Sequence, residues 1–475
     1  MSTRLSNGGR LINRSKSIEF SFDGKRLNGY EGDTLASALL ANNQTLVGRS
    51  FKYHRPRGIV ASGPEEPNAL VGLGKGSKFE PNQRATTTEL FEGLHSNSQN
   101  AWPSLEFDIG GINRIMSRVF PAGFYYKTFI FPRFAWKHVF EPFIRKAAGL
   151  GAAPTEKDSD KYEYFYAHVD VLIIGGGTSG LAAALEVGRS GAKVLVLEQK
   201  NTWGGRAPVD GVLIDNQISE EWIDDAMTEL QSMPNVTLKN RTMGAGVYDH
   251  GWATGYESIT DHIPGKKGPR QRLWRIRAKR ILTTTGAIER PLSFAGNDLP
   301  GVMLAGSVRD YLVDFGTSCG DIMVLATNND DAYRTAIKQS EVGLKVAAIL
   351  DARTSVTGEL PNKARELGIR VETGMAISKV KGSKSVSGVS ICLQAGEGVP
   401  LEEIKCDIVA MSGGWSPIVH LWSHCGGKLN WDAENAMFRP DAERPPLGDD
   451  GTGFVSVGLL IQHICLHLLL LHART

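Results

Sequence analysis

The chain has 475 residues, of which 41% are hydrophobic and 22% charged, and its formal net charge is +2. A chain of this length holds two to four domains of roughly 100–200 residues each. The composition is ordinary for a globular protein. The near-neutral balance argues against a dedicated nucleic-acid binder, which usually carries a strongly basic domain. We therefore expect no nucleic-acid partner.

The five cysteines all lie at or beyond Cys319, and none belongs to a CxxC pair. This pattern argues against a disulfide scaffold, a thiol-redox centre and a zinc ribbon, and it fits a reducing compartment. The N-terminal residues lack the apolar core of a signal peptide. No segment reaches the ~20 apolar residues of a spanning helix. We expect a cytoplasmic protein with no membrane partner and no metal site.

The first domain, residues 1–97, opens with an alternating segment, "SIEFSF", followed by the hairpin signal "DG" and a second strand, "KRLNGY". "GDTLASALLANN" then predicts a helix capped by Asp33 or Thr34. Strand, turn, strand and helix resemble the opening of plant-type ferredoxin modules. In those modules a cluster loop with cysteines follows, and cluster ligation requires thiolates. Here its place is taken by "RSFKYHRPRG", so we expect a ferredoxin-like β-grasp domain lacking a cluster.

The basic loop 49–58 has two open interpretations. Its cations are suited to an anionic flavin phosphate or to an acidic partner surface, or the loop is a solvated basic turn. Residues 98–168 form a connection rich in proline and aromatic residues. Its aromatic side chains pack against neighbouring domains or form a docking surface for a partner subunit.

The strongest signal is "VDVLIIGGGTSGLAAALEVGRSGAKVLVLEQ", from Val169 to Gln199. It contains a strand, a GxGxxG turn, a helix, and a second strand that ends in an acid about 20 residues further on, as a dinucleotide-binding unit requires. The glycines allow a tight turn, close approach of a pyrophosphate, and close helix–strand packing. The helix N-terminus offers N–H groups to phosphates. Glu198 is expected to bind the adenosine ribose and to disfavour a 2′-phosphate.

Two further segments are expected beside this cofactor. "NTWGGRAP" permits a second close backbone approach at Gly204 and Gly205, with Arg206 facing the pyrophosphate or a ring edge. The alternative is an ordinary glycine turn with a solvated arginine. "TTGA", which includes Thr285 and Gly286, resembles a small-residue segment of two-dinucleotide-fold flavoproteins. The predicted cofactor-binding residues are Gly175, Gly177, Thr178, Ser179, Gly180, Glu198, Gly205, Arg206, Thr285 and Gly286.

A second Rossmann-like unit is expected at 311–409. Its turn carries "NNDD" where glycines would stand, and carboxylates oppose a pyrophosphate, so we expect its own nucleotide site to be degenerate. The chain then returns to the first dinucleotide domain. The predicted divisions are 1–97, 98–168, 169–310, 311–409 and 410–475, with an atypical tail from 459.

Several stretches together, among them "RSFKYHRPRG", "PAGFYYKTF", "TTGAIERPL" and "NNDDAYRTA", resemble the N-terminal half of the α subunits of heterotetrameric sarcosine oxidases. The resemblance implies oxidative demethylation of sarcosine to glycine by an assembly with a β subunit, together with smaller subunits. It also implies NAD or FAD at the Gly175 site and an FMN at an interface with a partner subunit. The resemblance further implies that the amine is oxidised at a flavin held by another subunit. No residue here is an obvious amine-oxidising acid or base, so no catalytic residue is assigned in this chain.

The sequence departs from this family at its end. The resemblance implies that family α subunits continue into an aminomethyltransferase-like folate domain. We expect this chain to lack that domain, and we expect the tail "LLIQHICLHLLLLHART" to be non-native. Its histidines, His463 and His467, have no evident third ligand. Three other functions stay open: the α subunit of an opine- or proline-type dehydrogenase, a non-catalytic scaffold, and a nucleic-acid binder.

Overall fold

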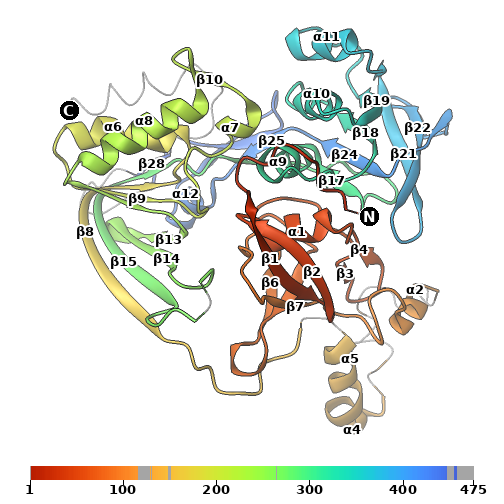
Figure 1. The fold of residues 1–475 in the computed structure, drawn as a ribbon, viewed down its shortest axis with the longest axis horizontal. Coiled ribbons are helices and arrows are strands. Elements are labelled where there is room, and N and C mark those ends of the chain that lie inside the picture. Colours follow the sequence, from red (N-terminus) through yellow and green to blue (C-terminus); the bar gives the residue numbers. More distant parts are fainter. Residues whose placement is uncertain are drawn as a thin grey trace. The chain divides into compact units, whose positions relative to one another are not determined.

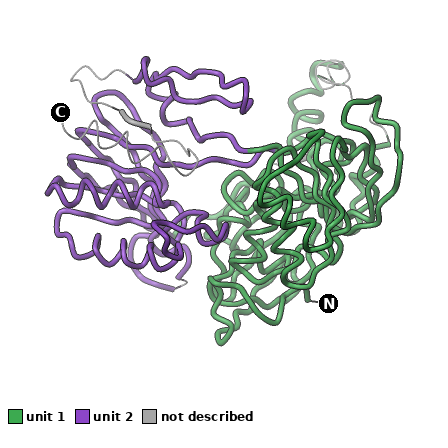
Figure 2. The backbone as a smooth tube through the Cα atoms, turned by 90° about the horizontal axis from the view of Figure 1, so that it is seen from above, with its two compact units in different colours: residues 1–159, 291–414 green, residues 160–290, 415–475 purple. Residues whose placement is uncertain are grey.

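The computed structural model describes residues 2–115, 123, 129, 131–147, 151–263, 265–446 and 454–456. Its contacts divide the chain into two compact units, which Figure 2 colours separately. Unit 1 contains residues 1–159 and 291–414, and unit 2 contains residues 160–290 and 415–475. Within the described residues, no helix has both the length and the apolar character needed to cross a membrane.

Unit 1 begins with the predicted β-grasp domain (Figure 1). Its sheet has the order β2-β1-β7-β5-β6. Asp23 and Gly24 both have positive φ, as a two-residue hairpin turn between β1 and β2 requires. Thr34 caps α1 by accepting a hydrogen bond from the Ser37 backbone N–H at 3.1 Å, which confirms the predicted helix start. The elements are β1 (Asn13–Phe22), β2 (Lys25–Glu31), α1 (Leu35–Ala41), β5 (Leu70–Leu73), β6 (Glu80–Arg84) and β7 (His95–Asn97).

The rest of unit 1 is built around a five-stranded parallel sheet in the order β17-β24-β18-β19-β20. β24 is buried along its whole length and β18 at every position after Ile322, as parallel strands covered on both faces are. An antiparallel sheet, β21-β22-β23, follows it in the chain. The elements are β17 (Val302–Leu304), α9 (Ala305–Phe315), β18 (Ile322–Thr327), α10 (Tyr333–Glu341), β19 (Lys345–Asp351), α11 (Glu359–Glu366), β20 (Val371–Thr373), β21 (Met375–Gly382), β22 (Val386–Leu393), β23 (Glu402–Ile404) and β24 (Ile408–Ser412).

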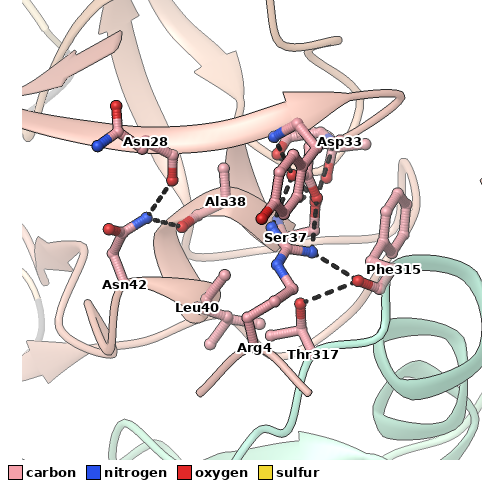
Figure 3. Close-up of polar contacts among 12 residues, drawn as sticks. Arg4, Asn28, Asp33, Ser37, Ala38, Leu40, Asn42, Phe315 and Thr317 are labelled. Carbon is pink, nitrogen blue, oxygen red and sulfur yellow. Dashed lines mark hydrogen bonds and ion pairs between the residues drawn. The ribbon is translucent and has the colours of Figure 1, made fainter. Parts of the chain in front are cut away.

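These two parts of unit 1 share one hydrophobic core. Phe20 and Leu39 of the β-grasp domain lie in the same buried cluster as Val308 and Tyr311 of α9. A buried ion pair also joins them (Figure 3): the Arg4 guanidinium binds the Asp33 carboxylate at 2.6 Å and donates to the Phe315 carbonyl. The β-grasp domain and the Rossmann-like domain therefore form a single packed body.

Short elements occupy the remainder of unit 1. The predicted aromatic connection lies partly outside the described residues, including most of "GFYYKTF". The described elements are β3 (Gly48–Arg49), β4 (Pro56–Arg57), η1 (Gly76–Lys78), η2 (Ile109–Gly111), α2 (Ile112–Ile115), α4 (Arg133–Ala135), η4 (Trp136–Phe140) and α5 (Glu141–Ala147).

Unit 2 contains a seven-stranded sheet in the order β12-β9-β8-β15-β14-β13, with β28 beside β15. The two long strands β8 and β15 pair in parallel over almost their whole length. Buried side chains of β8 and β9 pack against α6. The elements are β8 (Tyr162–Ile174), α6 (Thr178–Arg189), β9 (Val194–Leu197), α7 (Ala207–Asp210), β10 (Leu213–Ile214), β11 (Gln217–Ile218), α8 (Ser219–Ser232), β12 (Val236–Lys239), β13 (Thr242–Tyr248), η5 (Asp249–Gly251), β14 (Trp252–Ser258), β15 (Gln271–Thr283), β16 (Ala287–Glu289), β25 (Trp415–Pro417), α12 (His420–His424), β26 (Leu429–Asp432), β27 (Met437–Pro440) and β28 (Phe454–Ser456).

Two elements differ from the predicted divisions. β8 begins at Tyr162, inside the predicted connection 98–168, because residues 162–168 pair with Gln271–Arg277 of β15. β17 lies in unit 1 although its residues fall within the predicted range 169–310, because it pairs with β24 of the Rossmann-like sheet. The predicted tail from 459, with His463 and His467, lies outside the described residues.

Candidate functional site

Three loops meet where β8, β9 and β15 end. These strands run parallel, so their carboxyl ends lie at one edge of the sheet, where open α/β sheets bind ligands. The Gly204 backbone N–H donates to the Gly176 carbonyl at 2.8 Å, which joins the second glycine loop to the first. The Thr284 hydroxyl donates to the Gly175 carbonyl at 2.7 Å, which joins the third loop to the first. All ten predicted cofactor-binding residues belong to these loops, to Glu198, or to the first turn of α6.

Gly180 is required by the packing of the turn itself. A Cβ atom at Gly180 would lie 1.9 Å from the Gly175 carbonyl oxygen and 2.8 Å from the Thr284 hydroxyl oxygen. The helix can therefore approach the end of β8 only because this position has no side chain. Gly175 also has a φ of +114°, a conformation that residues with side chains rarely adopt.

Gly177 is different, because the protein itself does not require a glycine there. Its φ is −70° and its ψ is 179°, which any residue adopts. A Cβ atom at this position would meet only the Gly205 Cα, at 4.0 Å, which is an ordinary contact. A ligand group that lies close to the backbone, such as a pyrophosphate, explains a glycine at this position.

The N-terminus of α6 is arranged to receive an anion. Gly177 is the N-cap, and no side chain forms a capping hydrogen bond there. The first backbone N–H groups of a helix, here those of Thr178 and Ser179, have no partner within the helix. Together with the helix dipole they attract a negative group by about 0.3–1 kcal/mol at an exposed position.

Glu198 lies at the end of β9, where a dinucleotide fold places its ribose-binding acid. It is 7% exposed, and its carboxylate accepts hydrogen bonds from the backbone N–H groups of Gly176 at 2.7 Å and Lys200 at 2.8 Å. Burial raises the pKa of this carboxyl, although the N–H groups and Lys200 oppose the effect. These contacts fix the carboxylate beside the glycine turn.

Arg206 has contacts that the sequence pattern did not predict. Its guanidinium lies 5.1 Å from the centre of the Trp415 ring, and it binds the Asp210 carboxylate at 3.2 Å. The Thr285 hydroxyl donates to the Ile418 carbonyl at 2.9 Å, and the Gly286 carbonyl accepts the Ile418 N–H at 3.0 Å. The segment that begins at Trp415 therefore borders the third loop. Its only sequence signal is the "SGGW" turn.

Trp203 is a second residue that sequence reasoning missed. A Cβ atom at Gly176 would lie 2.4 Å from the Trp203 ring, so this ring covers the back of the glycine turn. The ring and Glu198 together leave no room for a side chain at Gly176.

In the Rossmann-like domain of unit 1, the acid that corresponds to Glu198 is Asp351, and the turn that corresponds to the glycine turn contains Asp330. Both residues bind Arg353. The Asp351 carboxylate, which is fully buried, accepts from the Tyr333 hydroxyl at 2.8 Å and from the Arg353 guanidinium at 2.7 Å. The same guanidinium binds Asp330, in the turn that lacks glycines, at 2.7 Å. The acid after the second strand is thus engaged by side chains of its own domain.

The buried carboxylate of Glu66 organises the loop of residues 60–69 in the β-grasp domain. Glu66 is 1% exposed, and its two oxygens accept four backbone N–H groups, from Val60, Ala61, Asn68 and Ala69, at 2.7–2.9 Å. Burial raises the pKa of this carboxyl against the four N–H groups, which lower it.

The cations of loop 49–58 also have partners in unit 1. Arg55 binds the Asp298 carboxylate at 2.5 Å and Arg57 binds it as well. The Arg49 guanidinium donates to the Leu105 carbonyl at 2.8 Å. These contacts anchor loop 49–58 to other parts of unit 1. Neither interpretation of the sequence, a phosphate or partner site or a solvated turn, included such intramolecular contacts.

Comparisons with known proteins agree with this architecture. Residues 15–101 match the family model "2Fe-2S iron-sulfur cluster binding domain", and residues 170–251 match "FAD dependent oxidoreductase". An iron–sulfur cluster needs thiolate ligands, and residues 15–101 contain no cysteine. The residues present do not fit that cluster.

Relatives match over most of the chain. The alpha subunit of sarcosine oxidase from Rhizobium meliloti is 46% identical over 94% of this chain and 45% of its own length. An opine oxidase subunit from Rhizobium meliloti is 26% identical over 59% of this chain and 56% of its own length. L-proline dehydrogenase from P. horikoshii has a TM-score of 0.60 and 20% identity over 96% of this chain and 71% of that chain. The last likeness concerns the fold alone.

Proposed function

The chain is a homologue of sarcosine oxidase α subunits over nearly its whole length and spans about half of theirs, and we propose that it serves as the dinucleotide-binding part of such a protein. The assembly would carry out oxidative demethylation of sarcosine to glycine, an oxidation at a CH–NH group. The proposed partners are a β subunit, together with smaller subunits, and the cytoplasm is the proposed location.

The observation that carries this proposal is the glycine turn between β8 and α6. Gly177 leaves room for a pyrophosphate, and the N–H groups of Thr178 and Ser179 would hold it. Glu198 would accept hydrogen bonds from the ribose hydroxyls, and its charge disfavours the 2′-phosphate of NADP. The rest of the dinucleotide would be bordered by Gly205, Arg206, Thr285 and Gly286.

The proposed ligand of this site is FAD or NAD. The match of residues 170–251 to FAD-dependent oxidoreductases supports FAD, and the resemblance to sarcosine oxidase implies NAD. A bound flavin supplies two-electron redox chemistry, while the protein binds and orients it. An FMN at an interface with a partner subunit is a further part of the proposal. The self-contacts of Asp351 and Arg353 favour one dinucleotide per chain.

An opine-type oxidoreductase is the second candidate, and the match to the opine oxidase subunit supports it. Identity and coverage of this chain are both lower for that relative than for the sarcosine oxidase relative, which favours sarcosine.

The substrate is tested by reconstitution. The chain is combined with the other subunits of the Rhizobium meliloti sarcosine oxidase, and oxygen consumption is measured with sarcosine, proline and an opine. The proposal predicts the highest kcat/KM with sarcosine. A preference for an opine contradicts it, and so does an assembled complex that turns over none of the three substrates.

A further inference from the structure

The sheet of unit 2 has an exposed face that the dinucleotide site does not use. It is formed by the first half of β8, the first half of β15, and β14, which Figure 1 shows next to one another. Strand residues alternate between the two faces, and the register places one set of side chains together: Tyr166 lies opposite Arg275, Arg275 opposite Thr254, and Trp252 opposite Arg277. We name this set the aromatic–arginine face, and its members are Tyr164, Tyr166, Trp252, Tyr256, Arg275 and Arg277.

Three tyrosines of this face are exposed, whereas the opposite face is buried along β15 and half-exposed along the start of β8. Tyr164 is 63%, Tyr166 59% and Tyr256 37% exposed. Trp274 and Ile276, which flank Arg275 in the sequence and lie on the other side of β15, are buried. β14 and β15 pair in an antiparallel way, and antiparallel strands with one exposed face usually carry polar residues on it. Here five of the eleven tyrosines of the chain gather instead, with Tyr162 and Tyr248 at the borders.

The arginines lie over the aromatic rings. The Arg275 guanidinium is 4.6 Å from the centre of the Tyr164 ring and 5.4 Å from that of Tyr166. The Arg277 guanidinium is 5.3 Å from the centre of the Trp252 ring. Cation–π contacts of this kind hold the guanidinium planes against the sheet, so the arginines are ordered in advance.

The six residues of the aromatic–arginine face include two arginines and no carboxylate. β8, β14 and β15 contain three carboxylates. Glu163 and Glu257 belong to the opposite face, where both bind Arg272, and Asp170, further along β8, binds Lys279 at 2.7 Å. Residues 242–283 carry eight lysines and arginines against three aspartates and glutamates. The whole chain has a net charge of only +2, so the segment that contains β14 and β15 is more basic than the chain as a whole.

We propose that the aromatic–arginine face is a docking surface for an acidic surface of a second protein subunit. Tyrosine, tryptophan and arginine are the residues enriched at the cores of protein interfaces, whereas lysine, glutamate and aspartate are depleted there. Ordered guanidinium groups match carboxylates in charge and in fork geometry. The inference rests on the proposed function, because it names where a partner of that assembly binds.

Nucleic acid is the competing occupant, since exposed aromatic rings also stack on bases. The contacts favour protein. Base stacking needs free ring faces, and the guanidinium groups of Arg275 and Arg277 already lie over the rings of Tyr164, Tyr166 and Trp252.

The test compares two double variants of equal charge change. Arg275→Glu/Arg277→Glu reverses the face, and Lys266→Glu/Lys267→Glu reverses two exposed cations in the loop between β14 and β15. Affinity for the other subunits of the Rhizobium meliloti sarcosine oxidase is measured by biolayer interferometry. We expect at least about 30-fold weaker binding for the first variant, the scale of an interface hot spot, and less than about 3-fold for the second.

A third variant protects the test against misfolding. Tyr164→Ser removes one exposed ring and leaves both arginines in place, so the fold is expected to be retained and the affinity to fall about 10-fold. Hydrogen exchange of the wild-type complex should show protection of residues 162–168 and 272–277.

Three results would overturn the proposal: equal affinities for both double variants, protection confined to other segments, or a wild-type chain that binds none of the subunits. Binding of a thirty-nucleotide poly-dT probe that Arg275→Glu/Arg277→Glu abolishes would assign the face to nucleic acid instead. Identifying the nucleotide that the purified protein releases tests the proposed function separately, because this measurement needs no partner subunit.

Discussion

Gly177→Ala separates a cofactor-binding glycine from a structural one. The backbone at Gly177 has ordinary φ and ψ, and the new methyl group would meet only the Gly205 Cα at 4.0 Å. The cost in folding stability is therefore that of alanine at an N-cap, about 1 kcal/mol or less. The same methyl group would occupy the space in which a pyrophosphate approaches the helix.

The expected loss of affinity follows from the hydrogen bonds that the ligand would lose. One hydrogen bond to a charged group contributes about 1.5–3 kcal/mol, which corresponds to about 10- to 150-fold weaker binding. Isothermal titration of NAD and of FAD measures this loss, and thermal unfolding measures stability.

The matched control is Gly396→Ala. Gly396 lies in unit 1, its φ is not positive, and a Cβ atom there would lie at an ordinary 3.6 Å from the Leu393 Cβ. This variant should keep both affinity and stability. Unchanged affinity in Gly177→Ala would refute the placement of the pyrophosphate. A large loss of stability would instead show that Gly177 is structural.

Two further variants test single carboxylates. Burial raises the pKa of Glu198 above its ordinary value, and ribose hydroxyls are held by the ionised form. NAD affinity should therefore fall as the pH decreases through that raised pKa, and Glu198→Gln should remove this dependence and narrow the preference for NAD over NADP. A wild-type affinity for NAD that does not change between pH 4 and 8 would contradict the role of the ionised Glu198 carboxylate in binding the ribose. Glu66→Gln replaces an oxygen that accepts two N–H groups by an NH₂ group that faces them. Urea unfolding should show a loss of about 2–4 kcal/mol, and a loss below about 0.5 kcal/mol would count against an organising role.

Local signals in the sequence predicted the features that depend on near neighbours. The strand, glycine turn and helix around Gly177 and the capped helix after Thr34 are encoded within about 30 residues each, and the structure confirms both elements. The early start of β8 at Tyr162 was missed, because "YEYFYAH" continues the aromatic character of the connection and becomes a strand only by pairing with β15.

Contacts between distant segments could not be predicted in this way. Arg57 and Asp298 are 241 residues apart, and Arg206 and Trp415 are similarly remote in the chain. No periodicity or motif links such pairs, since they depend on how whole elements pack. The basic loop therefore looked like a ligand or partner site, and its intramolecular partner became visible only in the fold.

The central claim is that the edge of the unit 2 sheet holds an adenine dinucleotide. Denaturing the purified chain and identifying the released nucleotide by mass tests it most directly. The account predicts one molecule of FAD or NAD per chain, either released from the protein as purified or taken up by the empty protein on titration. Protein that releases no nucleotide and binds neither FAD nor NAD at millimolar concentration would contradict it.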